Sequence, residues 1–360
     1  MKNKKIIKKN HDWNSFMRKI KSRQKRRLRN IAKNNMSKAQ RNELAMKKQL
    51  DQSFKSYKHL IAPLNFSLLD NTESVVAFIK QIDNCFEMKR DIFIEMTKVQ
   101  HIAYGAVVVL LSKLVQFRSN KIRVNGNFPQ NKEAKKMLKE SGFIEYLYKA
   151  NIEEKNEYYI DDKICTHANR IADPILSDSV IKNMSKLLWG EERRCIGVQR
   201  VFLELMQNTN NHASEIAGEK MWWSSIVPVK GHDNQFEKIC FSFIDYGVGI
   251  FSSLANKKKG IFFGVIDKIK KVFGNLNDAE MMKLLLRGEI HKTATGKTFR
   301  GKGLPGIYNA LKKNDISNLK IISNYAYADV GNNLYKTLQN DFSGTYVYWE
   351  LNLNNNNYKL

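Results

Sequence analysis

Apolar residues between positions 61 and 150 follow two spacings that alternate along the chain. Three short apolar runs bounded by polar residues predict strands: Leu64–Leu69, Asp91–Met96 and Lys121–Val124. Three segments carry apolar residues at every third or fourth position and predict helices: Thr72–Met88, Tyr104–Phe117 and Asn131–Leu138. Strands that alternate with helices predict an α/β domain with a largely parallel sheet.

Residues 191–352 form a second region with helix and strand patterns. Helices are expected from near Cys195 to His212 and over Ile307–Leu311, and strands at Ile239–Ile244 and Tyr346–Leu351. The predicted organisation is, in chain order, a basic helical arm (1–60), an α/β domain (61–150), a linker with a helix around Asp178–Leu188 (151–190), a second domain (191–352) and a tail (353–360).

The arm combines an apolar stripe with a high positive charge. Trp13, Phe16, Met17 and Ile20 have the spacing of one helix face. Residues 1–50 hold 18 Lys and Arg against two acids, a net charge of +16 out of +26 for the 360 residues. Such a basic amphipathic segment is typical of contact with nucleic acid, an anionic membrane or an acidic protein, and also of a solvated face docked on the body.

Other classes of protein are disfavoured. The longest apolar run, Ile102–Leu111, is far shorter than the about 20 residues that span a bilayer. The basic N-terminus lacks the apolar segment of a secretory signal. The four cysteines are scattered without disulfide or zinc spacing, so we expect reduced thiols in a cytoplasmic protein: Cys85, Cys165, Cys195 and Cys240.

The α/β domain resembles the STAS domain, the fold of anti-sigma-factor antagonists. The resemblance lies in the order of elements, the strand Ile92–Met96, the turn Ala103-Tyr104-Gly105 before an apolar helix, and the segment Leu138–Phe143. Where many such domains carry a phosphorylatable Ser or Thr, this chain reads Ile102-Ala103-Tyr104-Gly105. The resemblance therefore implies a docking module without a phosphate acceptor. An α/β domain of another topology stays open.

Four short motifs occur in order in the second region: Glu204–His212 (ELMQNTNNH), Asp245–Gly249 (DYGVG), Gly301–Gly306 (GKGLPG) and Ser343–Thr345 (SGT). Glu204, Asn208 and His212 share one helix face at intervals of four. An amide oxygen there can ligate Mg²⁺, a carboxylate can orient water and an imidazole can meet a phosphate.

The glycine motifs indicate close approach to a ligand. Asp245 ends a strand, and its carboxylate can accept a hydrogen bond from a purine amine. Glycine-rich backbone before a helix is typical of an anion site. The dinucleotide reading of Gly301–Gly306 is poor because a loop precedes it, and the Walker form is absent. Each motif alone also fits an ordinary polar helix face or turn.

Together, the four motifs resemble the GHKL (Bergerat-fold) ATPases, which include gyrase, histidine kinases and anti-sigma-factor serine kinases. The resemblance implies a C-terminal α/β sandwich that binds ATP and Mg²⁺. It places Asn208 as the metal ligand, Glu204 as the general base and His212 beside phosphate. It makes Asp245 the adenine-reading acid, supported by Thr345. The remaining residues that it assigns shape the adenine pocket and the phosphate loop: Gly247, Gly249, Gly301, Gly303, Leu304 and Gly306.

Residues 251–300 correspond in this resemblance to a lid with two helices, Ile261–Val272 and Asp278–Leu286. Four cations in or beside it are candidates to neutralise the γ-phosphate: Lys292, Lys297, Arg300 and Lys302. A lid of this kind is expected to order around nucleotide.

We expect a Mg²⁺-dependent, ATP-binding regulatory protein that hydrolyses ATP or transfers its phosphate to a protein partner. A histidine kinase acting on itself is disfavoured, because no upstream histidine has the adjacent acid and proline of a phosphoacceptor helix. Two alternatives stay open: an ATP-gated clamp that holds nucleic acid with residues 1–50, and a non-enzymatic adaptor switched by nucleotide. The oligomeric state is open, and a homodimer is among the options.

Overall fold

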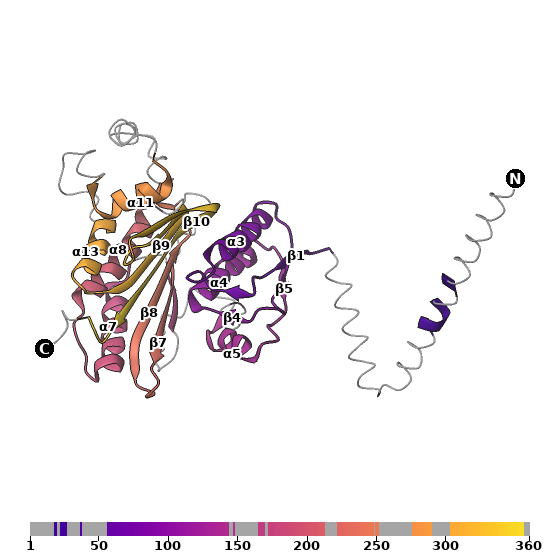
Figure 1. Cartoon of the computed structure of the whole chain (residues 1–360), viewed down its shortest axis with the longest axis horizontal. Helices are drawn as coiled ribbons and strands as arrows, with labels where there is room; N and C mark the ends of the chain where they lie inside the picture. The colour runs from indigo at the N-terminus through magenta and orange to yellow at the C-terminus, as the bar shows by residue number, and fades with distance from the viewer. Residues whose placement is uncertain are drawn as a thin grey trace. The chain divides into compact units, whose positions relative to one another are not determined.

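The computed structural model describes residues 18–19, 22–26, 37, 56–143, 147, 165–169, 172–212, 222–247, 249–251, 276–289 and 303–355, with backbone alone for 165–169 and 210–212 (Figure 1). The chain divides into two compact units, Met1–Tyr57 and Lys58–Leu360. In the first, residues 18–19 and 22–26 are helical and exposed. The second mixes helices with parallel and antiparallel sheets, which confirms the α/β class.

Residues 58–143, here called the N-terminal lobe, contain two small parallel sheets. Their strands are β1 (Lys58–Ile61), β3 (Ile92–Glu95) and β5 (Val124–Gly126) in one sheet, and β2 (Asn65–Phe66) and β4 (His101–Ile102) in the other. The helices are α3 (Thr72–Glu87), α4 (Tyr104–Ser119) and α5 (Lys132–Glu140). The predicted parallel pairing is confirmed.

Two strand predictions need correction. Residues 58–60 were assigned to the helical arm, but together with Ile61 they form β1, because Leu60 is buried and all four residues pair with β3. The third strand was predicted at Lys121–Val124, but the observed strand, β5, begins at Val124 and ends at Gly126. Lys121 has a φ of 60°, which places it in the turn after α4.

Residues 165–355, here called the C-terminal lobe, form a five-stranded antiparallel sheet. Its strand order is β6 (Cys165–Asn169), β7 (Trp222–Lys230), β8 (Phe236–Asp245), β10 (Leu334–Asn352) and β9 (Ser317–Asp329). Its helices are α7 (Pro174–Trp189), α8 (Ile196–His212), α11 (Asp278–Leu286) and α13 (Gly303–Lys312). β6 and α7 come from the predicted linker, yet β6 pairs with β7 and α7 packs on α8.

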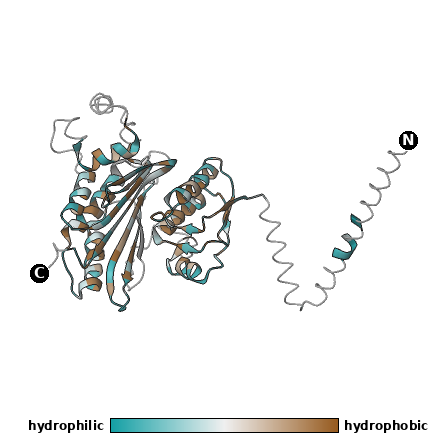
Figure 2. Ribbon diagram, viewed as in Figure 1, coloured by the Kyte–Doolittle hydropathy of each residue, from teal (hydrophilic) through white to brown (hydrophobic). Residues whose placement is uncertain are grey.

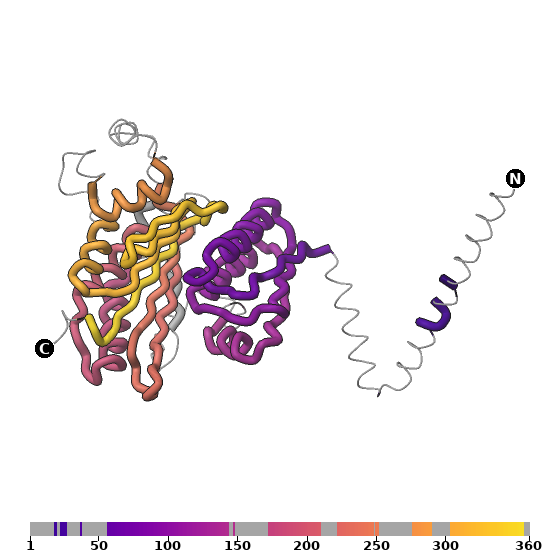
Figure 3. The backbone as a smooth tube through the Cα atoms, viewed as in Figure 1, coloured from indigo at the N-terminus to yellow at the C-terminus, as the bar shows by residue number. Residues whose placement is uncertain are grey.

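Helices cover both faces of this sheet. On one face, α7, α8 and α13 enclose an aromatic core in which Phe202 of α8 packs edge-on against Trp222 and Phe243. On the other face, α3 and α4 of the N-terminal lobe contact β10, β7 and β8, and the core there joins residues of both lobes. The backbone path is followed in Figure 3, and Figure 2 shows apolar residues in brown on the strands and on these helices.

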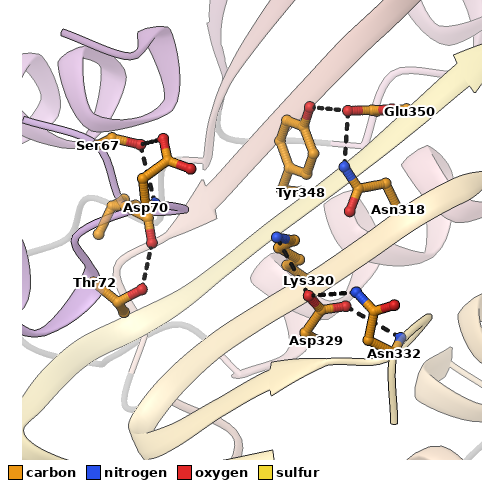
Figure 4. A network of polar contacts seen from close by, with 10 residues as sticks. Ser67, Asp70, Thr72, Asn318, Lys320, Asp329, Asn332, Tyr348 and Glu350 are labelled. Atoms are coloured by element: carbon orange, nitrogen blue, oxygen red, sulfur yellow. Dashed lines mark hydrogen bonds and ion pairs between the residues drawn. The ribbon is translucent and has the colours of Figure 1, made fainter. Parts of the chain in front are cut away.

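The face toward the N-terminal lobe also carries a polar network (Figure 4). Glu350 accepts hydrogen bonds from Tyr348 at 2.5 Å, Asn318 at 2.9 Å and Lys238 at 3.1 Å. These donors hold the pKa of the Glu350 carboxyl below its usual range, although burial opposes them. The network thereby satisfies a buried carboxylate inside the sheet.

Among the described residues, no helix has the length and apolar content needed to span a bilayer. The three cysteines with described side chains are free: Cys85, Cys195 and Cys240.

Candidate functional site

Three polar side chains form a row across the sheet on the face that packs against α8. Thr345 of β10 lies directly opposite Asp245 of β8 and Ser323 of β9. Directly opposed residues on adjacent strands point to the same face. The hydroxyl oxygens of Ser323 and Thr345 are 3.2 Å apart, within hydrogen-bond distance. The predicted pair Asp245 and Thr345 is therefore brought together, with Ser323 added to it.

Asp245 ends β8 in a desolvated position. Its Oδ1 accepts a hydrogen bond of 3.0 Å from the Gly247 N–H. Burial raises the pKa of the Asp245 carboxyl to about 6, and the Gly247 hydrogen bond acts in the opposite direction. A desolvated carboxylate is stabilised when a ligand donates hydrogen bonds to it.

The turn after Asp245 is fixed by β9. Gly249 has a φ of 78°, and a Cβ there would collide with the side-chain amide of Asn324. The N–H groups of the next two residues are also held from β9. Ile250 donates to Ser323 Oγ at 2.9 Å, and Phe251 donates to Asn324 Oδ1 at 3.1 Å. The backbone after Asp245 is thus set by two polar side chains of the neighbouring strand.

The first glycine of α13 lies against the polar face of α8. A Cβ on Gly303 would be 3.1 Å from Asn208 Nδ2 and 3.5 Å from Glu204 Oε2. The helix begins at Gly303, so its first N–H groups have no partner within the helix and its positive dipole end lies beside these side chains. The fold therefore brings the glycine motif that contains Gly303 next to the helix motif that contains Glu204 and Asn208.

One cation was not singled out by the sequence analysis. Arg200 lies one turn before Glu204 on α8 and is exposed. Its Nε and Nη2 are 3.7 Å from the place where a Cβ on Gly306 would be. Gly303 and Gly306 therefore lie beside a carboxylate, an amide and a guanidinium of α8.

Helix α11 contacts residues from two of the motifs' surroundings, the turn after Gly249 and the start of α13. It has the bounds that the sequence predicted and begins with a capping box between Asn277 and Glu280. Its buried Leu285 packs with a small apolar cluster: Ile250, Phe251, Leu276, Met281, Leu284 and Leu304. Residues from the turn after Gly249 and from the glycine loop therefore meet on one helix of the predicted lid.

Several predicted residues lie outside the described part. The side chain of His212 is not described, although its backbone closes α8. The following predicted residues and helix also lie outside the described residues: Lys292, Lys297, Arg300, Gly301, Lys302 and the first lid helix, Ile261–Val272. They stay predictions.

The described donors fit one kind of metal ion. No group of three or more His, Cys, Asp or Glu side chains that could hold a metal occurs among the described residues. Asn208 and Glu204 offer one amide and one carboxylate beside a glycine cradle that a side chain would fill. Mg²⁺ is commonly bound by one or two protein oxygens, several waters and the substrate phosphates, so this pair fits magnesium–nucleotide better than a free metal.

Ser323 and Asn324 were missed because their signal is weak. They follow the apolar pair Ile321 and Ile322 in β9, a strand that no motif marked. Buried polar residues need hydrogen-bond partners. The one sequence signal for Ser323 and Asn324 is therefore that two polar residues interrupt an apolar stretch of the strand.

Comparison with protein-family models, with curated proteins and with solved structures finds no match. Function is therefore inferred from the residues that the fold brings together.

Proposed function

We propose that the C-terminal lobe binds ATP with Mg²⁺ at this site and hydrolyses it or transfers its γ-phosphate to a partner, as the resemblance to GHKL ATPases implies. The observation that carries the proposal is the contact of Gly303 with Glu204 and Asn208. It places helix N–H donors, a carboxylate and an amide around one point, as a polyphosphate with its metal requires.

Each residue has a distinct role in this proposal. Asn208 contributes an oxygen to Mg²⁺, which supplies charge neutralisation at the phosphates when bound. Glu204 accepts a proton from the attacking water or hydroxyl, and the first N–H groups of α13 hold phosphate oxygens. Asp245 accepts a hydrogen bond from the exocyclic amine of adenine. Thr345, which lies opposite Asp245 on the adjacent strand, supports that carboxylate, and Ser323 on the next strand lies within hydrogen-bond distance of Thr345.

The N-terminal lobe is proposed to be a STAS-like docking module. Its parallel strands and the buried helix α4 support this reading, and Tyr104 opens that helix. Burial raises the pKa of the Tyr104 phenol to about 12. The absence of a serine or threonine in Ile102–Gly105 supports docking in place of phosphate acceptance.

The central experiment uses two site variants and one control in the full chain. Asp245→Asn should weaken binding of fluorescent ATP by about 10- to 100-fold, since the ligand loses a charged acceptor. Glu204→Ala should keep that affinity and lower turnover by about 100-fold or more. Gln207→Ala, an exposed position on the same helix, is the matched control. Unchanged binding in the first variant and unchanged turnover in the second would overturn the proposal.

The fate of the γ-phosphate distinguishes the chemistry. With γ-labelled ATP, label released as free phosphate indicates hydrolysis, and label retained on protein indicates transfer. Label that stays in ATP under all partner conditions, together with tight binding, indicates the nucleotide-switched adaptor.

The basic arm supports the clamp as a second candidate. The described helical residues of the arm are exposed and mostly basic: Arg18, Lys19, Ser22, Arg23, Gln24, Lys25 and Arg26. Binding to DNA or RNA should then weaken steeply with salt and disappear when residues 1–50 are deleted. Binding that is absent or insensitive to salt would reject the clamp.

A further inference from the structure

Strands β8 and β10 each place a proposed nucleotide residue next to a tyrosine. Asp245 is followed by Tyr246, and Thr345 is followed by Tyr346. Successive residues of a strand point to opposite faces of the sheet. Asp245 and Thr345 therefore lie on the α8 face, while the tyrosines lie on the face covered by the N-terminal lobe.

Tyr246 is bonded to the middle of α4. Its hydroxyl donates to the Val109 carbonyl at 2.9 Å and accepts from Ser112 Oγ at 2.6 Å. The ammonium group of Lys113 lies 4.1 Å from the centre of the Tyr246 ring and also pairs with Asp83 of α3 at 2.5 Å. The residue after Asp245 is thus held directly by α4, and Lys113 links it to α3.

Tyr346 is pressed against the first turn of the same helix. Its buried hydroxyl is 3.1 Å from Ser242 Oγ, and a Cβ on Gly105 would collide with it. Gly105, Val109 and Ser112 are spaced at i, i+4 and i+7, which is one stripe of a helix. One face of α4 therefore lies on both tyrosines, and the glycine allows the close approach.

We propose that Tyr246 and Tyr346 are positioning residues, through which docking of α4 sets the geometry of Asp245 and Thr345 for nucleotide. The inference rests on the proposed function. Because each tyrosine shares a peptide bond with its partner, a shift of the tyrosine ring relative to α4 moves the strand end that carries the partner. Binding of nucleotide and docking of the N-terminal lobe then favour one another by the same factor.

The test removes single contacts between α4 and Tyr246 in the full chain. Tyr246→Phe deletes only the hydroxyl, and Ser112→Ala deletes its partner from the α4 side. Each should weaken ATP binding by about five-fold, the equivalent of one hydrogen bond. The matched control is Lys80→Ala, which breaks the Lys80–Asp341 pair between α3 and β10 while leaving both tyrosines intact.

A second measurement reads the coupling in the opposite direction. Hydrogen exchange of the α4 amides, residues 104–119, should slow when ATP binds to the wild type. This slowing should shrink in Tyr246→Phe and persist in Lys80→Ala. If Tyr246 had a purely structural role, Tyr246→Phe and Lys80→Ala would both lower thermal stability, and the slowing of α4 exchange by ATP would be the same in the two variants.

The outcomes separate this inference from the proposed function. Equal ATP affinity in wild type, Tyr246→Phe and Ser112→Ala, with binding lost in Asp245→Asn, overturns the positioning role and leaves the ATP site intact. No ATP binding by the wild type overturns both. Gly105→Ala serves as a further variant: its added methyl displaces α4 from Tyr346, so it should weaken ATP binding without touching the nucleotide face.

Discussion

Gly303 lies so close to Asn208 that a methyl group on the glycine would be 3.1 Å from the amide nitrogen. This contact joins the start of α13 to the polar face of α8, at the point where the proposal places the phosphates and Mg²⁺. A methyl group at position 303 would require the amide to shift by a few tenths of an ångström.

Gly303→Ala should therefore weaken ATP binding by about 3- to 10-fold and reduce turnover at least as much, because the Asn208 oxygen moves away from the metal. Isothermal titration with Mg²⁺–ATP measures the effect. Gly331→Ala is the control, since a Cβ there meets nothing within 4 Å. Equal losses in the two variants would indicate a general effect of alanine.

Asp245 should make stability depend on pH. Its folded pKa is about 6, above the ordinary value of 3.8. The folded state therefore holds the proton more tightly, and its stability falls as pH rises from about 4 to about 6. At pH 7, Asp245→Asn should be more stable than the wild type by on the order of 1–3 kcal/mol.

Urea unfolding of both proteins at pH 4 and pH 7 checks this expectation. The difference should be present at pH 7 and nearly vanish at pH 4. A stability difference of the same size at both pH values would contradict the assigned direction.

The ion pair between Lys113 and Asp83 should be sensitive to loss of one partner. Both residues are buried, and Asp83 Oδ2 has no hydrogen-bond partner within the described part of the chain. Lys113→Met should lower the free energy of unfolding by about 3–5 kcal/mol, because it leaves a buried carboxylate without its cation.

The double variant Lys113→Met with Asp83→Asn should recover most of that loss. Denaturant midpoints of the wild type, both single variants and the double variant form the required cycle. A double variant less stable than either single variant would contradict this expectation, because the losses in the single variants would then not come from an unpaired buried charge.

The thiols of Cys195 and Cys240 should react slowly in the folded protein. Burial raises the pKa of Cys195 to about 12 and that of Cys240 to about 11, so the thiolate is scarce at pH 8. Reaction with a disulfide reagent at pH 8 should be slow until denaturant is added. Fast labelling of either residue in the native protein would contradict these raised pKa values.

Much of the fold followed from local pattern. Helices α3, α4 and α11 begin or end within a few residues of their predicted bounds, because the apolar residues of α3 and α4 and the capping box of α11 act within one segment. β1 and β6 were missed, since each is a short strand defined by pairing with a strand distant in sequence. Such pairing leaves little trace in the residues themselves.

The site was predictable where chemistry is concentrated in motifs and not where it comes from packing. Glu204, Asn208 and Gly303 could be singled out from spacing, and the fold brings them together. Ser323 and the two tyrosines could not, because their roles depend on which strand lies beside which and on a lobe that packs from the other side.

The alternation in β8 and β10 limits how this chain can change. Adding or removing one residue near the end of either strand would exchange the two faces, so a tyrosine would enter the α8 face and a carboxylate or hydroxyl would meet α4. Length variation should therefore be confined to the connections, such as the turn between β7 and β8, and these strand ends should not accept an insertion.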